Sequence, residues 1–272
     1  MTTSRIDARF AKLKAENRAG FVPFVMTGDP SREEALEILK GLPEAGADII
    51  EVGLAFSDPM AEGPPVQRAA QRGLKAGMTL RGTMDLVAEF RKTDQDTPVI
   101  LMGYLNPVES YGYARFAKEA AEAGIDGLIS VDCPPEEAAD LAAAMDAEQL
   151  SLIRLATPTS DDARLEVIAR GTSGFIYYVS VAGVTGVKEA QAASVAPAVA
   201  RVRKATGLPV AVGFGIKTPE RAAEIAHVSD AVVVGSALVD EVAAALEAGE
   251  AAVPRVLAKV RTLSDAVRNA RN

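Results

Sequence analysis

The residue best suited to proton transfer in this sequence is Glu51, in the run Asp-Ile-Ile-Glu-Val-Gly at 48–53. Side chains of a β-strand alternate between its two faces, so Ile49, Glu51 and Gly53 share one face. Burial without a positive partner raises the pKa of a carboxyl group towards neutrality, where it can both give and take a proton. We therefore expect Glu51 to be catalytic. The alternative is a structural Glu satisfied by a neighbouring Arg or a backbone amide.

A loop rich in Pro and Gly follows this run and carries two further carboxylates, Asp58 and Glu62, between residues 55 and 65. Loops of this length after a strand often bind ligands or cover a site. For either carboxylate alone, a solvated surface turn is the first interpretation.

Two glycine-rich segments in the second half indicate an anion site. Gly213-Phe214-Gly215-Ile216 follows one apolar run, and Gly235-Ser236 follows the next and directly precedes a helical pattern. Glycine allows the backbone to approach an anion, and the amides at a helix N-terminus point towards it. Together the two segments predict a phosphate ligand. Lys217 is more simply a solvated side chain.

Between these regions lie Tyr177 and a lightly built loop at 180–188. Tyr177 alternates with Phe175 and Val179, so its hydroxyl group can reach the interior, although a buried Tyr is more often a core residue. The loop, which we follow through 181–190, either closes over a ligand or is a plain turn.

Short apolar runs alternate with longer segments rich in Ala, Glu and Arg, an order typical of βα repeats. Several runs lack two-residue alternation, which indicates burial on both faces and a parallel sheet. Eight runs favour a single (β/α)₈ barrel over residues 1–272, with an extra N-terminal helix and an inserted loop and helix after the second strand; an open doubly wound sheet is the alternative. We expect strands at 21–27, 48–53, 98–103, 127–131, 152–156, 175–179, 209–214 and 230–235. Helices are expected from 31, ending near Pro43, and at 66–75, 83–91, 108–123, 135–147, 161–170, 191–205, 218–227, 236–248 and 264–269.

Three of these strands are introduced by similar turns. The sequence reads Ala-Gly-Ala-Asp at 45–48 and Ala-Gly-Ile-Asp at 123–126, with Val-Ser-Asp at 228–230 as a looser third copy. This weak repetition supports a barrel of βα units.

Composition excludes several classes of protein. The 272 residues carry 29 Lys and Arg against 37 Asp and Glu, a net charge of −8, which argues against nucleic acids and anionic membranes as main partners. One cysteine, Cys133, and one histidine, His227, leave no Cys/His set for a structural zinc. The N-terminal residues are charged where a signal peptide would be apolar, so we expect a cytoplasmic protein.

At this point the residues resemble the alpha chain of tryptophan synthase. The matching segments run in order across nearly the whole chain, and the Glu51 strand with Ser57-Asp58-Pro59 is the most specific of them. They are 21–25, Gly28-Asp29-Pro30, 48–53, 56–59, Gly63-Pro64, Gly103-Tyr-Leu-Asn-Pro107, Ser180 with 183–186, 213–216 and Gly235-Ser236.

The resemblance implies a lyase that splits indole-3-glycerol phosphate into indole and glyceraldehyde 3-phosphate by retro-aldol chemistry. It implies that Glu51 is the acid and base, and that Glu62, where the family usually has Asp, holds the indole N–H. Tyr177, Phe24, Met102, Ile129 and Thr185 would contact the substrate, and Gly186, Phe214, Gly215, Gly235 and Ser236 its phosphate.

The resemblance also implies a partner. Asp58 would face a tryptophan synthase beta chain in an alpha2beta2 heterotetramer. That beta chain carries pyridoxal phosphate, so no cofactor and no metal are expected in this chain.

Two other functions remain open at this stage. Another phosphate-binding barrel enzyme, such as a sugar-phosphate epimerase, would explain the glycine-rich loops but not the pairing of Glu51 with Ser57-Asp58-Pro59. A mainly regulatory subunit would bind the same substrate and activate a beta chain with little activity of its own.

Overall fold

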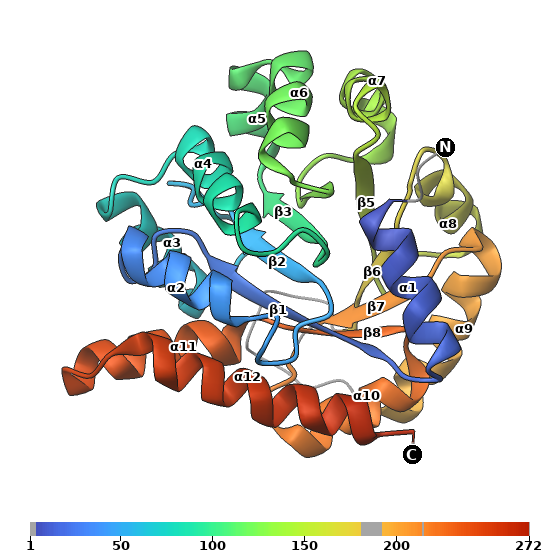
Figure 1. Cartoon of the computed structure of the whole chain (residues 1–272). Helices are drawn as coiled ribbons and strands as arrows, with labels where there is room; N and C mark the ends of the chain where they lie inside the picture. The colour runs from blue at the N-terminus through green and yellow to red at the C-terminus, as the bar shows by residue number, and fades with distance from the viewer. Residues whose placement is uncertain (1–3, 181–191, 214, 272) are drawn as a thin grey trace.

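The computed structural model describes residues 4–180, 192–213 and 215–271. Eight parallel strands close into a barrel in the order β1 to β8, with β8 pairing with β1, and helices surround it (Figure 1). The predicted (β/α)₈ barrel is confirmed, including the N-terminal helix and the insertion after the second strand. The strands are β1 Gly20–Met26, β2 Ile50–Gly53, β3 Val99–Gly103, β4 Gly127–Ser130, β5 Ser151–Ala156, β6 Ile176–Val179, β7 Val210–Gly213 and β8 Ala231–Val234.

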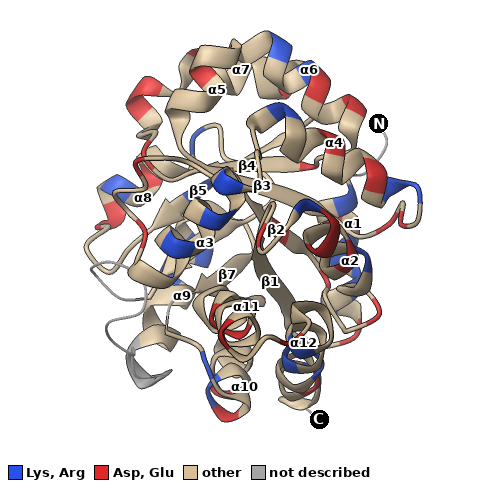
Figure 2. Ribbon diagram, turned by 90° about the vertical axis from the view of Figure 1, so that its left-hand side faces the viewer, with Lys and Arg blue, Asp and Glu red and all other residues tan. Residues whose placement is uncertain are grey.

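The helices fall close to the expected intervals, with charged residues of both signs spread over their outer faces (Figure 2). They are α1 Arg5–Ala15, α2 Arg32–Gly41, α3 Pro64–Lys75, α4 Leu80–Arg91, α5 Leu105–Tyr111, α6 Tyr113–Ala123, the 3₁₀ helix η1 Pro135–Glu137, α7 Ala139–Ala147, α8 Asp162–Ala169, α9 Ala192–Thr206, α10 Pro219–Val228, α11 Ser236–Ala248 and α12 Ala252–Asn269. Within the described residues, no helix is long and apolar enough to cross a bilayer.

Three helix boundaries differ from expectation. The single helix expected at 108–123 is two helices, because Gly112 has a φ of 89° and interrupts the helical backbone. The helix expected at 135–147 begins as the 3₁₀ turn η1. The C-terminal helix begins at Ala252 rather than near 264, since Val256, Val260, Leu263 and Val267 recur at helical spacing and bury one face.

The three repeated turns have a common structural role. The carboxylate of Asp48 accepts a hydrogen bond from the backbone N–H of Phe21 at 2.9 Å, at the start of the neighbouring strand. Asp126 does the same for Val99 at 2.8 Å, and Asp230 for Val210 at 2.8 Å. Each of these carboxylates also pairs with an arginine: Arg18, Arg91 and Arg203 respectively. The repetition therefore marks positions that fix the strand register at the N-terminal end of the barrel.

The apolar core has two layers, one between strands and helices and one inside the barrel. Helix α1 belongs to the inner layer, because its residues Ile6, Phe10 and Leu13 are buried against side chains from the strands. The ring centroids of Phe10 and Phe175 lie 5.6 Å apart. Helix α1 thus closes the N-terminal end of the barrel and leaves the C-terminal end for a site.

Candidate active site

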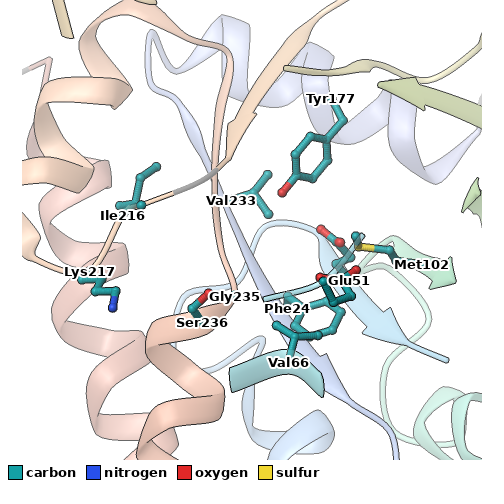
Figure 3. A pocket seen from close by; sticks show the side chains of 12 residues that line it. Phe24, Glu51, Val66, Met102, Tyr177, Ile216, Lys217, Val233, Gly235 and Ser236 are labelled. Carbon is teal, nitrogen blue, oxygen red and sulfur yellow. The ribbon is translucent and has the colours of Figure 1, made fainter. Parts of the chain in front are cut away.

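Glu51 lies inside the barrel, near the C-terminal end of β2. It aligns with Phe24 on β1 and Ile100 on β3, and its side chain faces the same pocket as Phe24 and Met102 (Figure 3). Only 2 % of Glu51 is exposed. No described residue forms an ion pair or hydrogen bond with its carboxyl group, so the structural alternative, a Glu satisfied by an Arg or an amide, is not what the structure shows. The group faces the pocket without a counter-charge.

Burial raises the pKa of Glu51 to about 8, and the negative charge of Glu62 adds to this effect. Burial likewise raises the pKa of Glu62 to about 7. Two acids in one apolar pocket repel each other when both are ionised, so near neutral pH the pair retains a proton. One of the two can then donate a proton while the other accepts a hydrogen bond.

The loop after β2 places Glu62 in the pocket. The ring of Phe56 stacks on Tyr104 with centroids 5.1 Å apart, and the backbone N–H of Ala61 donates to the Tyr104 hydroxyl at 2.8 Å. These contacts tie the loop to the residue after β3 and leave Glu62 only 8 % exposed. Asp58, by contrast, is exposed at the tip of the loop, where its carboxylate accepts a hydrogen bond from Ser57.

Tyr177 on β6 points its hydroxyl group into the pocket (Figure 3). Burial, with the charges of Glu51 and Glu62, holds its pKa well above the usual value, so the hydroxyl keeps its proton and can donate it in a hydrogen bond. A Cβ at Gly213 would lie 2.2 Å from this oxygen. Gly213 is therefore required for Tyr177 to occupy this place.

The opposite side of the pocket is formed by backbone at the ends of β7 and β8. Gly215, with a φ of 71°, and Gly235 and Ser236 all line it. Helix α11 begins at Ser236, after Gly235, and the N–H groups of Ser236 and Ala237 form no hydrogen bond to a described residue, so they are suited to bind an anion. This side is suited to a phosphate group, and Figure 3 shows Ser236 apart from Glu51 across the pocket.

The structure brings most of the predicted site residues together. Phe24, Glu51, Glu62, Met102, Tyr177, Gly215, Gly235 and Ser236 share one pocket. Ile129 does not line it; that side chain is fully buried inside the barrel, beside Ile100 and Ile153. Phe214, Thr185 and Gly186, with the loop at 181–190, lie outside the described residues.

Four lining residues were not predicted: Val66, Ile216, Lys217 and Val233. Val233 could have been found by alternation along β8, since Ala231 and Val233 both face inward. Lys217 is exposed, as the interpretation of a solvated side chain predicts, and it also borders the pocket (Figure 3). The free space between the lining side chains is about 50 Å³.

Among the described residues, no group of three or more His, Cys, Asp or Glu side chains is placed to hold a metal ion. The polar groups that line the pocket are two acids, a phenol, an amine, the Ser236 hydroxyl and backbone amides. They suit proton transfer and anion binding.

Comparison with known proteins agrees with this arrangement. The tryptophan synthase alpha chain family profile matches residues 10–268. The chain is 69% identical over 271 residues to the tryptophan synthase alpha chain of Phenylobacterium zucineum and 67% identical to that of Caulobacter vibrioides, in each case over 100% of this chain and 98% of the relative.

Solved structures are similar over the same length. Tryptophan synthase subunit alpha from Legionella pneumophila has a TM-score of 0.93 at 41% identity and covers 98% of this chain and 100% of its own. A chain of Mycobacterium tuberculosis tryptophan synthase has a TM-score of 0.88 at 36% identity, with 98% and 99% covered.

Proposed function

The chain belongs to the tryptophan synthase alpha chain family, and from that premise we propose how its pocket performs the reaction. It is a lyase that cleaves indole-3-glycerol phosphate into indole and glyceraldehyde 3-phosphate. The observation that carries the assignment of roles is a pair of buried acids, Glu51 and Glu62, that form no ion pair with a described residue and share their pocket with the start of α11.

Glu51 in its protonated form donates its proton to C3 of the indole ring. Positive charge then develops on the ring, and ionised Glu62 stabilises it by accepting a hydrogen bond from the ring N–H. The bond between C3 and the glycerol carbon breaks, and its electron pair returns to the ring. The hydroxyl group on that carbon loses its proton to Glu51 and becomes the aldehyde, which restores the protonated acid.

The remaining residues hold the substrate in place. Phe24 and Met102 contact the indole ring, and the Tyr177 hydroxyl donates to the substrate. The backbone at Gly215, Gly235 and Ser236 holds the phosphate, which fixes the reacting carbon near Glu51. By resemblance, Phe214 and Gly186 complete the phosphate site, and Ile129 and Thr185 the substrate site.

Lys217 adds a positive charge at the phosphate end. It borders the pocket, and among the described residues no carboxylate pairs with it. We expect Lys217→Ala to raise KM for the substrate about fivefold, roughly 1 kcal/mol for an exposed ion pair, with kcat nearly unchanged. Steady-state kinetics at low salt will measure this effect.

Lys217→Arg should restore the wild-type KM, whereas Lys204→Ala, a change at an exposed lysine of α9, should leave KM unaltered. An unchanged KM in Lys217→Ala would show that the Lys217 side chain contacts solvent and not the substrate phosphate.

As an alpha chain, the protein has a beta chain as its partner. We place the interface at the loop tip after β2, where Asp58 is exposed and Met60 is 77% exposed. We further propose an alpha2beta2 heterotetramer in the cytoplasm, with residues 1–272 forming one domain. Pyridoxal phosphate belongs to the beta chain, and this chain needs no cofactor of its own.

The direct test is release of indole from indole-3-glycerol phosphate by the purified chain, alone and mixed with a beta chain. Equal amounts of indole and glyceraldehyde 3-phosphate are expected, with faster release in the mixture. Activity only in the mixture would favour the mainly regulatory subunit. Absence of indole in both, together with turnover in a pentose-phosphate epimerase assay, would replace the lyase with another barrel enzyme.

A further inference from the structure

A second cavity, larger than the lyase pocket, lies at the C-terminal ends of β4 and β5, beside α8. Its volume is about 550 Å³, and it shares no lining residue with the pocket around Glu51. We call it the β4–β5 groove. It is formed by residues 130–135 at the end of β4, by Arg154, Leu155, Thr157, Thr159 and Ser160 on and after β5, and by Arg164 and Ile168 of α8.

Arg154 is the unusual residue of this groove. Its neighbours Ile153 and Leu155 belong to the apolar layer inside the barrel, so Arg154 points outward, on the same face as Leu152. It is only 8% exposed. Among the described residues, no carboxylate forms an ion pair with it.

The hydrogen bonds of Arg154 are also incomplete. Its Nη1 donates to the backbone carbonyl of Arg170 at 2.6 Å, and this is the one hydrogen bond that its guanidinium group makes to a described residue. Five N–H donors are present on a guanidinium. No fully buried side-chain nitrogen or oxygen of the described residues lacks a partner, so the other donors of Arg154 are accessible to solvent, and Arg154 lines the groove.

Comparison with Arg91, which is 6% exposed, shows what a satisfied arginine looks like in this protein. Arg91 pairs with Asp126 at 2.8 Å and donates to the carbonyls of Gly124 and Thr97. A buried charge without such a partner is costly, and burial lowers the pKa of Arg154. An anion in the groove would supply the missing partner.

The lining of the groove indicates which kind of anion fits. A carboxylate can accept two parallel hydrogen bonds from a guanidinium group. The walls of the groove combine the apolar side chains of Pro134, Pro135, Leu155 and Ile168 with polar ones, Ser130, Thr157, Thr159 and Ser160, and with the carboxylate of Asp132. The other arginine, Arg164, already pairs with Glu136, whose negative charge disfavours a doubly charged ligand.

We propose that the β4–β5 groove binds a small organic carboxylate with an apolar body, held by the guanidinium group of Arg154. The site is independent of the lyase reaction. It gives the chain a second ligand, separate from its substrate.

Cys133, the only cysteine of the sequence, lines the groove and serves as a local probe. We expect benzoate to slow alkylation of Cys133 by iodoacetamide in the full chain, measured by mass spectrometry at constant pH. Because only the unoccupied fraction reacts, the rate falls by the factor 1 + [benzoate]/Kd, about elevenfold at ten times Kd. Neutral benzamide and inorganic phosphate should have little effect.

Arg154→Met removes the charge and keeps much of the side-chain volume, so benzoate should no longer slow alkylation in this variant. Arg261→Met, a change at an exposed position of α12, is the matched control and should respond as wild type. Equal protection by benzamide, stronger protection by phosphate, or unchanged protection in Arg154→Met would overturn the proposal. If Arg154→Met does not fold, the comparison of benzoate with benzamide on the wild-type chain still decides it.

Discussion

The variant Glu51→Gln is expected to cleave indole-3-glycerol phosphate about 10²- to 10⁴-fold more slowly than the wild type, which corresponds to loss of useful turnover. Gln cannot donate a proton to the indole ring or accept one from the hydroxyl group. The decrease should appear in kcat, because the phosphate contacts of Gly235 and Ser236 stay in place. Indole release under saturating substrate measures it.

The same variant should be folded, and at high pH more stable than the wild type. In the folded chain the pKa of Glu51 is raised to about 8 from an ordinary value near 4.5, so its protonated form is favoured by folding. The contribution of protonated Glu51 to the free energy of unfolding is complete below pH 4.5 and is lost as the pH rises through about 8. Melting followed by circular dichroism should therefore show a Tm advantage of Glu51→Gln that grows from pH 5 to pH 9.

Glu247→Gln, a change at an exposed position of α11, is the control and should alter neither kcat nor the pH dependence of Tm. Near wild-type cleavage by Glu51→Gln would reject the assignment of Glu51. An unfolded Glu51→Gln would instead give this side chain a structural role.

Glu62→Gln is expected to lower kcat about 10²- to 10³-fold, because the amide no longer places negative charge beside the ring nitrogen as positive charge develops. Glu62→Asp keeps the carboxylate and shortens it by one methylene. We expect Glu62→Asp to retain activity within about tenfold of the wild type. If both variants lose activity equally, position rather than charge is what the reaction requires.

The pH profile separates the two acids. The reaction needs Glu62 ionised and Glu51 protonated, so kcat/KM of the wild type should rise through about pH 7 and fall through about pH 8. In Glu62→Gln the rise should disappear while the fall remains. A profile that is flat from pH 6 to pH 9 would contradict the assignment of both roles.

The barrel could be predicted because its strands are continuous apolar runs at regular intervals, and parallel strands buried on both faces give that pattern. Helix ends were harder to place. The break at Gly112 depends on a positive φ that sequence periodicity does not reveal, and the early start of α12 depends on packing against α10, α11 and α2. Local pattern identified the strands and most of the helices, whereas the positive φ of Gly112 and the packing of α12 set ends that the pattern did not reveal.

The catalytic half of the site was predictable because a Glu in an apolar strand is rare and conspicuous. Alternation placed Glu51 and Tyr177 inside the barrel, but it could not tell how deep a side chain lies along the axis. Ile129 shares the inward face with Met102 and yet lies outside the pocket lining. The sequence does not show that Lys217 borders the pocket, because a single lysine after a glycine loop does not indicate where its side chain points. It does not single out Arg154 either, because the partners of an arginine in a strand are known only once the fold is known.

The position of α1 affects how reactants gain access to the active site. With Phe10 packed on Phe175, α1 covers the N-terminal end of the barrel, so reactants approach Glu51 from the C-terminal end. Indole released beside Glu51 leaves through the same C-terminal end. A protein bound over the C-terminal end of the barrel would therefore decide whether the released indole reaches bulk water or moves to a second site.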